Sequence, residues 1–510
     1  MRAAVPALLM LLWVAPARAG RLEALGPETT TTWTTGESPP VSATPWWQTL
    51  GDTALAGVLD AGLGGNLDLQ AAWGRLDQAR AGALQAASPL MPSVTFDITT
   101  STQPIDTFGF QFSALGFGGG GSAAAAPPAT APTTTTPTGT ATGTAGPPGS
   151  LEAPAAPEVP ELPELFHSGQ GALNARWVLD VFGRQTLAWR ASHHEASAAE
   201  GDRAAQAIAV TTLIAEAYYD VAVSRARVRV IEDQILAQEQ LLELVRLRFE
   251  AGSATGLDVL QQQQALAGTR AILPPVRAGL RARELQLALL LGRPPADVPT
   301  VSDILPPPAP LPPLGRPADL ADNRPDVRAA AERLTASHQR STSAKLGFAP
   351  TVSASAAVGR QFTWLTEYDD QPFWNVGVGV SVPVFQGGAV WSGVRQARGA
   401  EHTAIATWNQ GWLSALQEVE AAVATDIERR AAHEAAVAQE EAARATFDES
   451  RDRYLAGLDS YLTVLQSQAA LQNAELNRLQ AHRDLLSARI QLHDALGGPW
   501  THDLWSGASR

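Results

Sequence analysis

The chain has 510 residues, a formal net charge of −14 and no cysteine. The absence of cysteine excludes disulfides, thiolate metal sites and cysteine nucleophiles within this sequence. The negative charge disfavours a nucleic-acid partner because it would be repelled by the phosphate backbone, and the length allows one large domain or two of ordinary size.

The first 19 residues have the pattern of a secretory signal peptide. Arg2 supplies the positive start, residues 7–14 form a short apolar run, and residues 17–19 (Ala-Arg-Ala) match a small-x-small cleavage site. The run is shorter than the roughly 20 apolar residues of a spanning helix. No later segment is predicted to be a spanning helix, so strands are expected to make any membrane crossing. Residues 20–49 are expected to form an extended N-terminal segment.

Residues 50–295 are predicted to contain a helix, a β-hairpin at 92–181, a long helix, a turn at a glycine and a second helix. The first strand alternates apolar residues with Ser, Thr and Asp from Ser93 to Thr99. Between the strands, residues 115–165 are rich in Gly, Ala, Thr and Pro and bury too little apolar surface to order themselves. They suit an external barrel loop, where insertions are tolerated.

Long helices dominate the prediction. Residues 184–250 contain no proline and show apolar residues at helical spacing, which corresponds to a helix roughly 100 Å long. A shorter partner helix is predicted at 256–292, and Pro274 and Pro275 are expected to kink or interrupt it.

A Pro-rich linker at 296–319 leads to residues 320–500, which are predicted to repeat the same order of elements. The second hairpin is expected at 350–386, followed by helices at 389–455 and 460–496 and a tail at 501–510. Its last strand shows the clearest alternation, with Trp374 and every second residue from Val376 to Val384 apolar.

The sequence is therefore read as an internal tandem duplication, which decides the architecture. Neither half can bury its apolar stripes alone, so the halves are expected to pack together. The matched positions are Gly252, Leu257, Val259, Leu260, Gln261 and Leu266 with Gly457, Leu462, Val464, Leu465, Gln466 and Leu471.

We predict a mainly α fold with a small β part, in which long antiparallel coiled-coil helices form an α-barrel tunnel. Four strands of about 9–12 residues suit a membrane barrel, but they cannot close one alone, and open edges are forbidden in lipid. If the strands lie in a membrane, several copies must share one barrel, with the number left open. An ordinary soluble sheet or a spectrin-like bundle is the alternative.

The ordered motifs resemble those of TolC-type outer-membrane efflux proteins (outer-membrane factors), specifically the NodT-like branch that serves RND pumps. The resemblance covers nearly all of residues 45–500. The motifs are Trp46-Trp47, Leu50-Gly51-Asp52, Asn66-Leu67-Asp68-Leu69 with Ala71-Ala72, Pro92-Ser93-Val94, Trp177 with Asp180 and Phe182-Gly183-Arg184, Asn323-Arg324-Pro325-Asp326-Val327, Val382-Pro383-Val384-Phe385 and Gly387-Gly388.

The resemblance implies a homotrimer whose four strands per subunit form a shared 12-stranded barrel in the outer membrane of a Gram-negative bacterium. It further implies a large periplasmic helical tunnel, docking onto a periplasmic adaptor (membrane fusion) protein, and an inner-membrane pump, with the RND type favoured. Outer-membrane lipid is the remaining partner, and nucleic acid is not one. Gly20 stands where relatives often carry a lipid-anchored cysteine, so no anchor through an N-terminal cysteine is expected.

No catalytic motif is found, and we expect no enzyme activity, cofactor or metal site. His193-His194-Glu195 is the nearest approach to a metal cluster, but adjacent residues point to different faces of a helix. A surface role is therefore predicted for these three residues.

The resemblance places a gate at the helical tips, at 250–258 and 454–463. Asp258 and Tyr454 match gate positions of the family and suggest a mutual hydrogen bond. Asp459 replaces an arginine of the family, and Thr463 and Gln466 replace two tunnel-lining aspartates. The alternative role of Asp258 is to cap the following helix. Arg248 is a further candidate for cross-helix pairing, or else part of a solvated face.

The tips are also the expected contact surface for an adaptor, because tight turns expose backbone and small side chains there. The glycines are predicted to end helices in a left-handed conformation. The contact candidates are Gly252, Ser253, Ala254, Gly457 and Leu458.

The predicted function is a passive outer-membrane exit duct that conducts small molecules and is gated at its periplasmic tip. One alternative is the outer-membrane component of a type I protein secretion system. Another, of a different class, is a non-porous periplasmic coiled-coil structural protein. Cargo identity is not predicted, because an exit duct contacts its cargo weakly.

Overall fold

The computed structural model describes residues 32–36, 38–42, 44–104, 165–302, 305–364, 368–498 and 500. The expected signal peptide, the loop at 115–165 apart from its last residue, and the tail at 501–510 lie outside the described residues. The chain divides into two compact units. A helical unit comprises Met1–Leu90, Asp180–Pro350 and Val382–Arg510, and a sheet unit comprises Met91–Leu179 and Thr351–Ser381.

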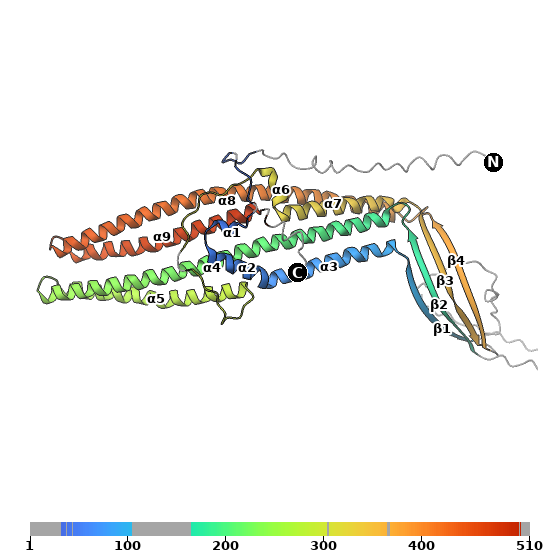
Figure 1. The fold of residues 1–510 in the computed structure, drawn as a ribbon, viewed down its shortest axis with the longest axis horizontal. Helices are drawn as coiled ribbons and strands as arrows, with labels where there is room; N and C mark the ends of the chain where they lie inside the picture. Colours follow the sequence, from blue (N-terminus) through green and yellow to red (C-terminus); the bar gives the residue numbers. More distant parts are fainter. Residues whose placement is uncertain are drawn as a thin grey trace, which may run out of the picture. The chain divides into compact units, whose positions relative to one another are not determined.

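The helical unit is built from long helices that run side by side (Figure 1). Three-residue 3₁₀ turns occur at Ser88–Leu90, Pro317–Asp319 and Leu346–Phe348. The helices are α1 (Trp46–Thr49), α2 (Thr53–Gly65), α3 (Leu67–Ala87), α4 (Arg184–Glu250), α5 (Gly256–Leu290), α6 (Leu320–Asn323), α7 (Pro325–Lys345), α8 (Ala389–Leu455) and α9 (Tyr461–Leu496).

The helix lengths confirm the tandem duplication. Helices α4 and α8 both have 67 residues, and α3 and α7 both have 21. Helices α5 and α9 have 35 and 36 residues. Left-handed glycines, Gly183 and Gly388, precede α4 and α8 with φ values of 77° and 85°, so even the entries into the two long helices correspond.

Helix α5 continues through Pro274 and Pro275, so the expected interruption is wrong. Each proline lacks an N–H, and the carbonyl four residues earlier loses its helical partner. Those carbonyls belong to Arg270 and Ala271, which are exposed on this helix. Water can therefore satisfy them, and the helix tolerates the defect.

In the part of the chain that the structure describes, three apolar clusters form the interior of the helical unit. The largest surrounds the middle of α4, where Tyr218 and Tyr219 pack with Leu55 and Leu287. A second surrounds Trp412 on α8, and a third joins the ends of the two helical hairpins. Among the described residues, one window of α4 is long and apolar enough to span a membrane, contrary to expectation, but 67% of that window is buried inside the unit.

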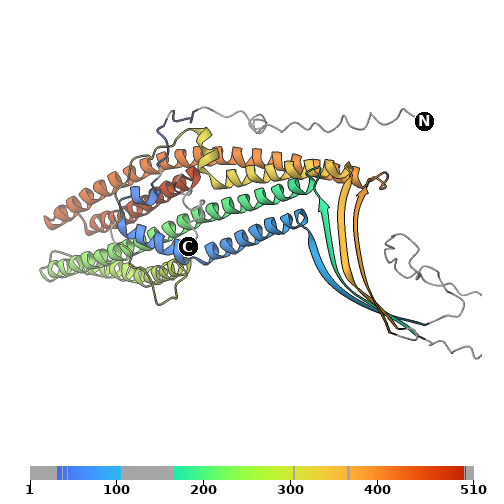
Figure 2. The same cartoon turned by 45° about the vertical axis from the view of Figure 1, so that its right-hand side comes forward.

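The sheet unit is a four-stranded antiparallel sheet in the order β1-β2-β3-β4 (Figures 1 and 2). The strands run longer than the alternating stretches in the sequence. They are β1 (Ser93–Pro104), β2 (Leu165–Leu179), β3 (Thr351–Trp364) and β4 (Tyr368–Ser381).

The register gathers the apolar side chains on one face of the sheet. Phe96, Leu173, Val358 and Trp374 stand opposite one another across the four strands. The described residues leave this face uncovered, and Trp374 remains 77% exposed. The other face is polar: Asn174 Nδ2 donates to Asp97 Oδ2 at 2.8 Å, and Ser101 and Ser168 share a hydrogen bond.

Candidate functional site

The helical hairpins α4–α5 and α8–α9 end in two equivalent turns at the same end of the helical unit (Figure 1). Gly252 has φ +72° and donates to Phe249 O, while Ser253 N donates to Arg248 O at 2.8 Å. In the second turn Gly457 has φ +78° and donates to Tyr454 O, and Leu458 N donates to Arg453 O. This Schellman geometry confirms the predicted left-handed glycines.

The predicted contact residues lie around these turns. Gly252, Ser253 and Gly457 are exposed and Ala254 is half-buried. Leu458 is 69% exposed. These residues therefore place exposed backbone and one exposed apolar side chain at this end of the helical unit.

Asp258 caps helix α5. Its Oδ2 accepts from Thr255 N at 2.8 Å, and Thr255 Oγ1 accepts from Asp258 N at 3.3 Å, which completes a capping box. Within the described ranges, the predicted hydrogen bond between Asp258 and Tyr454 is not found within the chain. The Tyr454 hydroxyl has no hydrogen-bond partner among the described residues. Burial, and then the charge of Asp258, raise the pKa of Tyr454, while the neighbouring Arg248 guanidinium opposes this rise.

Arg248 links the two hairpins. Its Nη1 donates to Leu455 O at 2.8 Å, at the last turn of α8. Its Cζ lies 4.6 Å from the centre of the Tyr454 ring, in cation–π geometry. A cation at a helix C-terminus satisfies an orphan carbonyl and meets the negative end of the dipole. Arg248 therefore contacts the opposite hairpin rather than solvent alone.

The contacts described for the remaining gate candidates lie within their own hairpin. Asp459 Oδ2 accepts from Arg453 Nε at 2.9 Å, within the α8–α9 turn. Thr463 lies in the first turn of α9 beside Ser460, 3.3 Å between hydroxyl oxygens. Gln466 is exposed. Among the described residues, Asp459 therefore makes no contact with the other hairpin.

A buried polar chain, missed from the sequence, joins the hairpins below Arg248. Tyr461 on α9 donates its hydroxyl to Gln262 Oε1 on α5. Gln262 Nε2 donates to Gln238 O on α4 at 2.8 Å, and Gln238 Nε2 donates to Thr269 Oγ1 at 2.9 Å. All four side chains are buried. Burial raises the pKa of Tyr461, which keeps its hydroxyl a neutral donor.

We call the Arg248 contacts with Leu455 and Tyr454, together with the Tyr461–Gln262 hydrogen bond, the hairpin latch. The latch includes two members of the third apolar cluster. The rings of Tyr461 and Tyr454 pack edge to face, with ring centres 5.4 Å apart, and the cluster also contains Leu241, Val245 and Val464. In the sequence, Gln262 lies at a position where the helical spacing expects an apolar residue. That mismatch is the signal that could have identified it.

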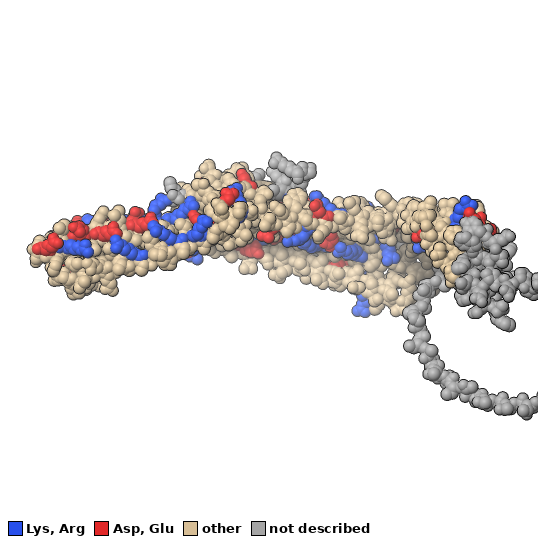
Figure 3. All heavy atoms as spheres, turned by 90° about the horizontal axis from the view of Figure 1, so that it is seen from below, with Lys and Arg blue, Asp and Glu red and all other residues tan. Residues whose placement is uncertain are grey.

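Charged side chains follow one another along the surface of the helical unit (Figure 3). They include the pairs Arg270–Glu239 and Arg277–Glu232 between α4 and α5, and Arg444–Glu475 between α8 and α9. Exposed pairs of this kind each contribute about 0–1 kcal/mol. Gln234 on α4 donates to Glu475 Oε2 at 2.9 Å, which adds another contact between the hairpins.

Within the part of the chain that the structure describes, no group of three His, Cys, Asp or Glu side chains could hold a metal ion. His194 is paired with Glu332 at 2.7 Å, and His193 is exposed. The two neighbouring histidines therefore have separate surroundings.

Comparison with known proteins relates both halves of the duplication to one family. The family model described as outer membrane efflux protein matches residues 165–293 and 317–498, which is more than half of the chain. The pyoverdine export outer membrane protein OpmQ of Pseudomonas aeruginosa is 27% identical over 464 residues, covering 90% of this chain and 88% of the relative. The solvent efflux pump outer membrane protein SrpC of Pseudomonas putida is 30% identical over 348 residues, covering 65% of this chain and 71% of the relative.

A solved structure shares the fold. The outer membrane protein VceC of Vibrio cholerae matches with a TM-score of 0.71 and 22% identity, covering 90% of this chain and all of that chain.

Proposed function

Because the chain belongs to the outer membrane efflux protein family, we propose that it is the outer-membrane exit duct of a tripartite efflux system. It conducts small molecules passively from the periplasm to the exterior. The relatives named for pyoverdine export and solvent efflux support a small-molecule cargo class rather than exported protein.

The observation that carries the proposal is the sheet with one bare apolar face and two open edges. Among the described residues, strands β1 and β4 each have one neighbouring strand. Uncovered valines and Trp374 suit contact with lipid, and the opposite face of Ser, Thr, Asn and Asp suits a water-filled interior. Open edges cannot remain in lipid, so copies must pair edge to edge. Three copies give a 12-stranded barrel, as the resemblance implies.

The partners follow from the exposed turns. We propose that a periplasmic adaptor protein contacts Gly252, Ser253, Ala254, Gly457 and Leu458, and that it connects the duct to an inner-membrane pump, with the RND type favoured. The turns offer exposed backbone and one exposed leucine. These features suit the end of a helical hairpin of the partner.

The hairpin latch is proposed to hold the tip closed. Its contacts lie between hairpins rather than within them, so they can break while each hairpin stays folded. Each hydrogen bond contributes only about 0.5–1.5 kcal/mol. An adaptor that binds the open arrangement more tightly can therefore shift the equilibrium.

The test is reconstitution of the purified protein. We expect native mass spectrometry in detergent to give three copies, and planar bilayers to show a channel that is mostly closed. A strictly monomeric protein, or an oligomer without conductance, would support the non-porous coiled-coil alternative. Deleting the gene separates efflux from type I secretion. Loss of an efflux duct should raise sensitivity to small toxic compounds, whereas loss of a secretion duct should change the set of secreted proteins.

A further inference from the structure

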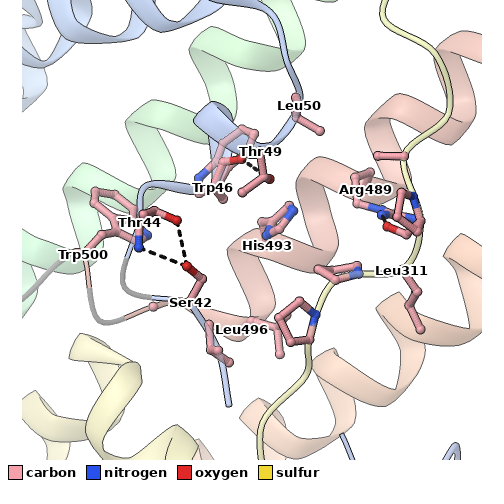
Figure 4. Close-up of a pocket in the computed structure, with 17 residues that line it drawn as sticks. Ser42, Thr44, Trp46, Thr49, Leu50, Leu311, Arg489, His493, Leu496 and Trp500 are labelled. Carbon is pink, nitrogen blue, oxygen red and sulfur yellow. Dashed lines mark hydrogen bonds between the residues drawn. The ribbon is translucent and has the colours of Figure 1, made fainter. Parts of the chain in front are cut away.

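A pocket lies where three distant segments of the helical unit meet (Figure 4). The segments are the N-terminal stretch with α1, the Pro-rich linker, and the end of α9. Its volume is about 210 Å³, and its lining is mainly apolar. The side chains used below are Trp46, Leu311, Arg489 and His493.

His493 is a polar residue that lines this pocket. Its ring stacks on Trp46, with ring centres 5.4 Å apart and an interplanar angle of 15°. Its side chain is half-buried, and among the described residues no hydrogen bond or ion pair to it is found, so its ring nitrogens are left for a ligand. Burial, and then Arg489, lower the pKa of His493 to about 3, so the ring is neutral and offers one donor and one acceptor nitrogen.

The charges beside the pocket are already compensated. Arg489 donates to both carboxylate oxygens of Asp426, at 2.8 and 2.9 Å, and also to Pro310 O. Arg489 and Asp426 are both buried, so this bidentate pair is held in place. A charged ligand would find no free counter-charge in this group, which favours an uncharged one.

We propose that this pocket binds a small uncharged aromatic molecule that carries a hydroxyl group, with the hydroxyl hydrogen-bonded to His493. The volume supports a single ring, since a dry cavity of about 150 Å³ is enough for benzene. The stacked Trp46 and His493 rings provide an aromatic wall. A hydroxyl both donates and accepts, so it matches either nitrogen of a neutral imidazole.

Such a ligand would join the N-terminal segment, the linker and α9. It would stabilise this junction by mass action, independently of any conduction through the duct. The inference does not depend on the proposed function, and its failure would leave that function untouched.

The first experiment measures binding to the whole protein in detergent. 4-Fluorobenzyl alcohol is followed by ¹⁹F NMR, and crystals are soaked with 4-bromobenzyl alcohol to locate bromine by anomalous scattering. We expect saturable binding, bromine density within the pocket, and a melting temperature that rises with ligand concentration. Density for water or for the protein's own residues in the pocket, with no bromine, would overturn the proposal.

Two variants separate specific binding from partition into detergent. His493→Phe keeps a ring of similar shape and removes both nitrogens. We expect it to weaken 4-fluorobenzyl alcohol binding several-fold and to leave 4-fluorotoluene, which lacks the hydroxyl, unchanged. Leu311→Trp, which fills the pocket, should abolish binding of both probes. Leu413→Trp, on the exposed surface of α8, is the matched control and should bind both probes like the wild type.

Equal affinity of the alcohol for the wild type and His493→Phe would remove the role of His493 and contradict the proposal. Equal affinity in Leu311→Trp would place the binding elsewhere and contradict it as well. Should His493→Phe fail to fold, the comparison of the alcohol with 4-fluorotoluene on wild-type protein still decides. The proposal then requires 4-fluorobenzyl alcohol to bind the wild-type protein several-fold more tightly than 4-fluorotoluene does.

Discussion

Arg248 makes two contacts with the opposite hairpin, and its removal should weaken the closed tip. Arg248→Ala loses the hydrogen bond to Leu455 O and the cation–π contact with Tyr454. Together these two contacts contribute about 1–2 kcal/mol per chain to the stability of the closed tip. We expect a higher open probability in single-channel recordings and easier entry of a large antibiotic. Arg246→Ala, an exposed neighbour on the same helix, is the control and should leave both quantities unchanged. Equal behaviour of the two variants would exclude Arg248 from the latch.

The two tyrosines of the latch should respond differently to loss of their hydroxyls. Tyr461→Phe leaves Gln262 Oε1 buried without its donor, which costs about 1–3 kcal/mol. Tyr454→Phe removes a hydroxyl that has no hydrogen-bond partner among the described residues, so it should be nearly neutral. Single-channel open probability and thermal unfolding measure both effects. The reverse order would mean that the closed tip depends on a Tyr454 bond, as the family pattern first suggested.

His493 should make the protein less stable in acid. Its pKa is lowered from 6.5 to about 3 in the folded chain, so the unfolded chain binds more protons between these values. Stability is therefore fully present above about pH 6.5 and is lost as the pH falls toward 3, by on the order of 4 kcal/mol in all. His493→Phe should flatten the melting temperature between pH 7 and 4. His402→Phe, at an exposed site, should keep the wild-type slope.

At the scale of elements, the approximate bounds of the two long helices could be predicted from the sequence. Helices 184–250 and 389–455 are bounded by glycines with positive φ, and their interiors lack proline. The strands were predicted too short because their outer parts lose the alternation, at Gly169 and Gln361 for example, while backbone pairing continues. The latch could not be predicted in detail. It depends on which side chains two separate hairpins bring together, as with Tyr461 and Gln262.

Pairing between β2 and β3 requires glycine at residue 359. A Cβ there would lie 2.3 Å from Gly171 O and 2.8 Å from Ala172 Cα, both backbone atoms that cannot rotate away. Gly359→Val should therefore disrupt the sheet and prevent assembly of the oligomer in the outer membrane. Gly379→Val is the matched control, because its nearest neighbour is Ser353 Oγ at 3.4 Å. Membrane fractionation and native gels would show the difference. Normal assembly of Gly359→Val would mean that this close approach is not needed.

At the scale of the whole molecule, the two faces of the sheet should tolerate charge very differently once copies have closed a barrel. Val378 lies on the apolar face of β4 and is 73% exposed in the chain, while Asn375 lies on the polar face of the same strand. In a barrel the first faces lipid and the second faces water. An arginine facing lipid costs about 2–4 kcal/mol near the bilayer midplane, and each oligomer carries that cost once per copy.

Val378→Arg should therefore reduce the amount of oligomer in the outer membrane and lower the temperature at which it dissociates. Asn375→Arg should assemble normally and change only conductance and ion selectivity, because a charge inside a wet lumen keeps its hydration. The two variants share strand, residue introduced and charge, so the difference between them reports which face meets lipid. Equal assembly of both variants would mean that the apolar face is covered by protein, and the shared barrel would have to be abandoned even if the helices still form an oligomer.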